Sequence, residues 1–169
     1  MGVIFGGTLI AFGDTRSRGR LVLVGVWESP EERGIVILPI SPTVLVADDD
    51  PAFSNRVHQL IESEFQVVAT VEDGQALLEA SRQRQADLYL VDISMPRLNG
   101  FQAARLLMKE QPNARILFLT VHEDPAAVAE ALAIGVAGYV LKRSAAADLI
   151  PALRQVLQGG RFVSAAVHE

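Results

Sequence analysis

Residues 88–100 read LYLVDISMPRLNG and indicate how the chain folds. Four apolar residues are followed at once by an acid, Asp92, and then by a loop that contains proline, asparagine and glycine. A short run that is apolar at every position is typical of a strand buried on both faces of a parallel sheet. Ligands of such sheets bind at the carboxyl ends of the strands, which is the position that Asp92 occupies.

The same kind of apolar run recurs on both sides of this stretch, and a helical pattern separates each run from the next. Regular alternation of strand and helix predicts an α/β fold, a doubly wound parallel sheet of five strands with helices on both faces. The runs occupy residues 44–47, 67–71, 88–91, 116–119 and 139–141, and the helical stretches occupy residues 50–65, 74–84, 102–110, 124–134 and 145–158.

Polar side chains follow four of these five runs. Asp48 and Asp49 follow the first, Asp92 the third, Thr120 ends the fourth, and Lys142 follows the fifth. Carboxylates held together repel one another, so a proton or a cation must compensate their charge. An all-oxygen ligand set favours a hard ion, and we expect Mg²⁺, with Mn²⁺ as the alternative. An ammonium suits a phosphoryl group and an aspartate can attack phosphorus, so the residues predict a site that accepts a phosphoryl group on Asp92.

Residues 43–164 resemble the receiver domain of two-component response regulators, and the NarL/LuxR-type subgroup in particular. The resemblance rests on VLVADDDP, LYLVDISMPRLNG, ILFLTVHED and GYVLKRS, which occur in the family's order and at its spacing. It implies a flavodoxin-like fold. In one departure, Arg143 follows Lys142 where many receivers have a proline after a cis peptide bond, so the sequence leaves the geometry of that bond open.

The resemblance assigns roles to the acidic residues. Asp92 would be the phosphoacceptor and a metal ligand. Asp49 would bind Mg²⁺ directly, whereas Asp48 would act largely through water. The backbone carbonyl of Ser94 would complete the protein's share of the metal ligands.

The resemblance also assigns a switch. Thr120 would bind a phosphoryl oxygen and shift inward on activation, and Lys142 would neutralise the remaining oxygen charge. Tyr139 would be the switch aromatic whose rotamer follows Thr120. Ser94 and His122 occupy two variable positions that would tune how long the phosphoryl group survives.

A signalling switch is the predicted function, and the chain is expected to catalyse only its own phosphorylation and slow autodephosphorylation. The implied donor is a histidine kinase or phosphotransfer protein, and the implied target is a downstream protein partner, with a homodimer as a further option. Three alternatives stay open. The chain could be the receiver part of a transcriptional regulator whose DNA-binding domain is absent, a phosphate-independent pseudo-receiver, or a phosphatase with an aspartyl nucleophile. Ser94 weakens the last, because such phosphatases usually carry a second aspartate at that position.

Composition narrows the function classes further. The 169 residues are 50% hydrophobic and 21% charged, with a net charge of −5 and no cysteine. This composition excludes general disorder and thiol chemistry, and it argues against broad binding to nucleic-acid backbones. Too few residues follow Gly160 for a helix-turn-helix, so no direct contact with nucleic acid is expected. The apolar runs near the start are too short to span a bilayer and lack a basic flank, which predicts a cytoplasmic protein without membrane contact.

Residues 1–42 differ in character from the rest. Three short β-rich runs, at residues 3–12, 21–27 and 35–38, are separated by polar, turn-forming stretches. The sequence leaves open whether this extension is a small meander, a partly ordered arm or a misassigned start. We therefore predict an N-terminal extension over 1–42 that is dispensable for phosphorylation, a receiver domain over 43–164 and a tail over 165–169.

Overall fold

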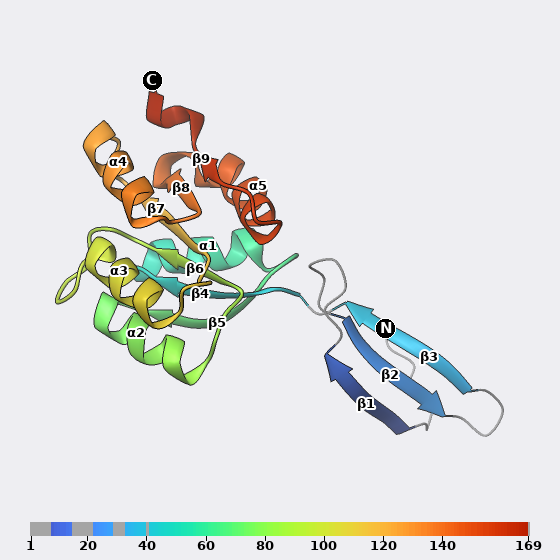
Figure 1. The fold of residues 1–169 in the computed structure, drawn as a ribbon. Coiled ribbons are helices and arrows are strands. Elements are labelled where there is room, and N and C mark those ends of the chain that lie inside the picture. Colours follow the sequence, from blue (N-terminus) through green and yellow to red (C-terminus); the bar gives the residue numbers. More distant parts are fainter. Residues whose placement is uncertain (1–7, 15–21, 29–32, 40, 169) are drawn as a thin grey trace. The chain divides into compact units, whose positions relative to one another are not determined.

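The computed structural model describes residues 8–14, 22–28, 33–39 and 41–168. The chain divides into two compact units, residues 1–41 and residues 42–169 (Figure 1). Each unit has its own sheet, so the two are described separately.

In the first unit, the described residues form an antiparallel sheet in which the strand order follows the chain. The β2–β3 register is regular and aligns Val24 with Ile37, whereas the β1–β2 register shifts between Ala11 and Asp14. Residues 3–7, which the sequence also assigned to a β-rich run, lie outside the described residues. The strands are β1 (Thr8–Asp14), β2 (Val22–Glu28) and β3 (Arg33–Pro39).

The second unit is built on a parallel sheet in the order β5-β4-β6-β7-β8-β9. The doubly wound parallel sheet predicted from the sequence is confirmed, but it has six strands rather than five. The additional strand, β9, contains only two residues and pairs in parallel with β8 at Gly138 and Tyr139. The strands are β4 (Thr43–Ala47), β5 (Gln66–Val71), β6 (Leu88–Val91), β7 (Ile116–Thr120), β8 (Gly138–Leu141) and β9 (Phe162–Val163).

Side-chain caps start four of the five helices of this unit. Backbone N–H groups of the first turn, which would otherwise lack partners, donate one or two hydrogen bonds to each of the cap side chains Asp50, Asp73, Asn99 and Asp124. In the described part of the chain, none of the helices has the length and apolarity needed to cross a membrane. The helices are α1 (Pro51–Ile61), α2 (Gly74–Gln83), α3 (Gly100–Glu110), α4 (Pro125–Ile134) and α5 (Ala145–Leu157).

The core consists of two apolar layers, one on each face of the sheet. Alternate residues of β4 enter different layers, with Leu45 in one and Val46 in the other. Helices α2, α3 and α4 cover the first layer, and α1 and α5 cover the second (Figure 1). Because both faces are covered, β4, β6, β7 and β8 are apolar along almost their whole length, and their polar side chains are left to the strand ends.

Candidate functional site

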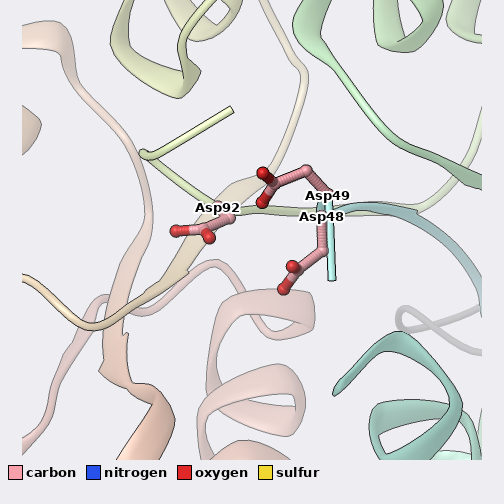
Figure 2. Close-up of side chains that lie close together, drawn as sticks. All are labelled: Asp48, Asp49 and Asp92. Carbon is pink, nitrogen blue, oxygen red and sulfur yellow. The ribbon is translucent and has the colours of Figure 1, made fainter. Parts of the chain in front are cut away.

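Three carboxylates meet at the carboxyl ends of β4 and β6. These strands are neighbours, and the Asp92 N–H donates to the Ala47 carbonyl at 2.8 Å, which places Asp92 beside Asp48. Asp48, Asp49 and Asp92 each offer an oxygen, and these atoms lie within 4.8 Å of one another (Figure 2). Asp48 and Asp92 are each 3% exposed, whereas Asp49 is exposed. Two of the three charges are therefore held out of water.

Lys142 enters this cluster from the end of β8. Its Nζ lies 2.7 Å from Oδ2 of Asp48 and 2.8 Å from Oδ2 of Asp92, so it bridges the two buried carboxylates. Its side chain is 12% exposed, and its Nζ lies 4.7 Å from the ring centroid of Phe53. The peptide bond to Arg143, whose geometry the sequence left open, is trans.

The electrostatics of the cluster favour an added cation. Burial raises the pKa of Asp48, although the hydrogen bonds from Lys142 and from the Asp50 N–H oppose this effect. Burial alone would lower the pKa of Lys142, but its hydrogen bonds to Asp48 and Asp92 outweigh burial and raise it, so the ammonium stays charged. The cluster contains three carboxylates and one ammonium, which contacts two of them. The all-oxygen donor set therefore fits a hard divalent ion such as Mg²⁺.

A second network adjoins the carboxylates. Thr120 is fully buried, and its Oγ1 accepts a hydrogen bond from the His122 N–H at 3.3 Å. The hydroxyl of the buried Tyr139 donates to the His122 carbonyl at 2.9 Å. Ser94 Oγ lies 2.7 Å from His122 Nε2, and the Ser94 N–H donates to Oδ1 of Asp92 at 3.3 Å. These contacts connect Asp92 to Tyr139 through the loops that follow β6 and β7.

Burial, with smaller contributions from the charges of Asp124 and Asp92, raises the pKa of Tyr139 far above its ordinary value. Its hydroxyl therefore stays protonated and remains a donor to the His122 carbonyl.

The loop between β6 and α3 is anchored to the start of α2. The Gly74 N–H donates to the Leu98 carbonyl at 3.0 Å, and Arg97 forms an ion pair with the buried side chain of Asp73. Arg97 has φ 63°, a left-handed conformation that non-glycine residues seldom adopt. Sequence reasoning missed this anchor and also missed the contact between Phe53 and Lys142. Neither leaves a sequence signal, because both depend on side chains that meet across separate elements.

The predicted site residues therefore fall into two connected groups. The structure brings together the side chains of Asp48, Asp49, Asp92 and Lys142. The hydroxyls of Thr120 and Tyr139 instead contact the His122 backbone.

Comparison with known protein families gives one match that covers most of the second unit. The model of the response regulator receiver domain matches residues 44–154. The transcriptional regulatory protein DegU of Brevibacillus brevis is 37% identical over 122 residues, which are 71% of this chain and 52% of that protein. The chain spans about half the length of the curated relatives it matches.

Solved structures show the same fold. A two-component response regulator of the LuxR family from Aurantimonas sp. SI85-9A1 matches with a TM-score of 0.73 and 29% identity, covering 76% of this chain and 94% of that one. The isolated REC domain of RcsB from Salmonella enterica serovar Typhimurium, solved with the phosphomimetic BeF3⁻, matches with a TM-score of 0.71 and 28% identity. That match covers 76% of this chain and 97% of the RcsB chain.

Proposed function

Because this chain belongs to the response regulator receiver domain family, we propose that it accepts a phosphoryl group on Asp92 in the presence of Mg²⁺ and then changes conformation to control a protein partner. The observation that carries the proposal is the carboxylate cluster, in which Lys142 contacts the buried Asp92 directly. Receiver domains are in general signalling switches rather than enzymes with an external product.

The proposed reaction is an in-line displacement at phosphorus. One Asp92 carboxylate oxygen attacks the phosphorus of a phosphohistidine, a new O–P bond forms, and the N–P bond breaks. The leaving imidazole keeps the electron pair and is protonated by solvent. When bound, Mg²⁺ supplies positive charge to the phosphoryl oxygens. Hydrolysis of the acyl phosphate later restores the carboxylate.

The other residues of the cluster position the metal ion and the Lys142 ammonium. Asp49 and Asp92 would bind Mg²⁺ directly, Asp48 would act largely through water, and the backbone carbonyl of Ser94 would complete the protein's share of the metal ligands. Lys142 already contacts the reacting carboxylate, so its ammonium is placed to neutralise a phosphoryl oxygen on Asp92. Replacing Asp49 by Ala should weaken Mg²⁺ binding, since it removes a ligand from an all-oxygen site.

The proposed switch runs through the second network. In the structure the Thr120 hydroxyl accepts a hydrogen bond from the His122 N–H. A phosphoryl group on Asp92 draws this hydroxyl inward and away from His122. That movement displaces the His122 carbonyl, which is the hydrogen-bond acceptor of the Tyr139 hydroxyl. Ser94 and His122, which contact each other beside Asp92, set how long the phosphoryl group survives. If beryllofluoride left the amide spectrum of residues 120–145 unchanged, this switch would be wrong.

Mass spectrometry after treatment with acetyl phosphate and Mg²⁺ tests the central assignment. Wild-type protein should gain one phosphoryl group, and Asp92→Ala should gain none. Glu62→Gln, which also removes a carboxylate but lies at the exposed end of α1, is the matched control and should label as wild type does. A label that persists in Asp92→Ala would refute the assignment. No label on wild type would favour the pseudo-receiver, and continuous release of phosphate would favour a phosphatase.

The partners follow from the family. A histidine kinase or phosphotransfer protein supplies the phosphoryl group, and a downstream protein reads the switch. A second candidate function is the receiver part of a transcriptional regulator, and the length of the relatives supports it, because this chain spans about half of them. Measuring the mass of the natural protein in its own cells discriminates the two. A mass near 18.3 kDa supports the first, and a mass clearly above that value supports the second.

The extension over residues 1–42 is proposed to be dispensable for phosphorylation. The division of the chain after Ser41 supports this boundary, and all the assigned site residues lie beyond it. Truncation before Pro42 should leave the melting temperature and the labelling rate unchanged. A large fall in either would show that the extension is part of the receiver's stability or reaction.

A further inference from the structure

The ammonium of Lys142 has a third neighbour besides its two carboxylates. Its Nζ lies 4.7 Å from the ring centroid of Phe53, within the range in which a cation is attracted to the face of an aromatic ring. Asp48 follows β4, Asp92 follows β6 and Phe53 lies in α1. Three separate elements therefore surround one charged group, and we call Asp48, Asp92 and Phe53 the lysine cradle.

The backbone fixes Phe53 relative to Asp48. The Asp50 N–H donates to Oδ1 of Asp48 at 2.9 Å, and the Asp50 side chain in turn accepts from the Phe53 N–H at 3.1 Å. The ring of Phe53 also packs against the apolar layer beneath α1 and α5. The helix cap therefore fixes the backbone at Phe53, and the apolar layer supports its ring.

The three members of the lysine cradle respond differently when the site is used. The carboxylates of Asp48 and Asp92 bind Lys142, but both also belong to the group that could hold a metal ion, and Asp92 would also carry the phosphoryl group. The ring of Phe53 has no oxygen atom, so neither the metal ion nor the phosphoryl group binds to it. It is the neighbour of the ammonium that stays available throughout the reaction.

We propose that Phe53 is a positioning residue for phosphoryl transfer: its ring face keeps the Lys142 ammonium over Asp92 when metal and phosphoryl group occupy the carboxylate oxygens. This inference rests on the proposed function, because it assigns Lys142 to a phosphoryl oxygen. The attraction between a cation and an aromatic ring corresponds to a factor in an equilibrium or rate constant. That factor is about 2-fold at exposed sites and about 30-fold at desolvated sites. Since Lys142 is largely buried, we expect an effect of about tenfold.

Phe53→Leu tests the proposal because it keeps an apolar side chain but removes the ring. At saturating Mg²⁺, its rate of labelling by acetyl phosphate should fall about tenfold. Phe53→Tyr should label within about twofold of wild type, because it restores the ring face. Replacement of Phe53 by pentafluorophenylalanine keeps the shape of the ring but reverses the charge of its face, and should slow labelling at least as much as Leu. Leu60→Ala, elsewhere on α1 and packed on the same layer, is the control and should lower stability but not the labelling rate.

The lysine signals give a readout that does not depend on activity. The chain has two lysines, Lys109 and Lys142, so a protein labelled with ¹³C-lysine gives two assignable sets of ε-methylene signals. The Lys142 set should be shifted upfield by the ring in metal-free protein and with Mg²⁺ and beryllofluoride. The shift should disappear in Phe53→Leu and persist in Phe53→Tyr.

Each result decides between outcomes. If Phe53→Leu labels at the wild-type rate, or if the Lys142 shift vanishes from wild type once Mg²⁺ and beryllofluoride bind, the positioning role is refuted. If Leu60→Ala slows labelling as much as Phe53→Leu does, the effect belongs to the packing of α1 and the role is again refuted. If wild-type protein does not label at all, the proposed function fails, whereas the lysine spectrum still shows whether Phe53 holds Lys142.

Discussion

Gly100→Ala should disrupt the backbone that carries the phosphoacceptor. Gly100 is the first residue of α3, and a Cβ at this position would lie 2.2 Å from the Asp92 carbonyl oxygen and 2.8 Å from Cα of Ile93. Both are backbone atoms, so no side-chain rotation relieves the collision. Real Cβ contacts essentially never fall below 3.0 Å, so α3 and the Asp92 peptide must separate by roughly 0.8 Å at least. The hydrogen bond from the Gly100 N–H to the Ile93 carbonyl, 2.9 Å long, lies in the path of that movement.

Two measurable losses follow from this displacement. Overpacking against a rigid backbone costs about 3 kcal/mol, which lowers the melting temperature of a domain of this size by roughly 10 °C. A misplacement of about 1 Å at a reacting group can cost about 100-fold in rate, so labelling of Asp92 by acetyl phosphate should fall by about that factor. Differential scanning calorimetry and a labelling time course at a temperature where both proteins are folded measure the two effects.

Gly159→Ala is the matched control. A Cβ at Gly159 meets no atom within 4 Å, but the residue has φ +83°, so the variant carries only the strain of a left-handed backbone, about 1 kcal/mol. Its labelling rate should equal that of wild type. If Gly100→Ala labels within twofold of wild type and melts no lower than Gly159→Ala, the reasoning from the close approach of α3 to Asp92 is refuted.

Three further predictions concern other contacts of the site. Tyr139→Phe removes the donor to the His122 carbonyl and should lower the free energy of unfolding by about 1 kcal/mol in urea denaturation, whereas no loss would show that this bond does not hold the loop. Asp48→Asn should raise the melting temperature of metal-free protein, because burial raises the pKa of this carboxyl and disfavours its charge, and should reduce the stabilisation by Mg²⁺; the opposite order would contradict the pKa direction. The hydrogen bond from Arg97 lowers the pKa of Asp73 below its ordinary 3.8, so the stability that this carboxylate adds is complete above pH 3.8 and is lost as pH falls through the lower pKa of the folded state. Asp73→Asn should therefore flatten the decline of stability below about pH 4, and an unchanged acid profile would count against this linkage.

The parts of the fold that were predictable are those whose burial is decided locally. Strands β4, β6, β7 and β8 are covered on both faces, and this requires apolar residues at successive positions, which a single sequence displays directly. The polar residues that end these runs then meet at one edge because the strands are parallel. The proximity of Asp48 to Asp92 follows from the pairing of β4 with β6.

Features decided by contacts between distant residues were not predictable. Strand β9 is too short to show a pattern, and it is anchored by Ser164, whose Oγ donates to Oδ2 of Asp148 at 2.5 Å and accepts from the Leu141 N–H at 3.4 Å. Helix α1 ends at Ile61, four residues before the expected Phe65, although Phe65 is apolar and buried as a helix face requires. Phe65 is buried although it lies outside the helix, in the turn that leads into β5, where its N–H donates to the Ile61 carbonyl.

The position of Lys142 at the strand ends was predictable, but its bridging of two carboxylates was not, because side-chain length and burial decide which partners it reaches. The bridge has a chemical consequence. In the metal-free site the ammonium already compensates part of the negative charge that a metal ion would compensate, so metal and lysine are alternative partners for the charge of Asp48 and Asp92. A metal ion that neutralises these carboxylates weakens their attraction for Lys142, and the nearby ammonium lowers the affinity of the site relative to three unpaired acids. A lysine released in this way would turn toward solvent unless another group held it, and the ring of Phe53 is the neighbour positioned to do so.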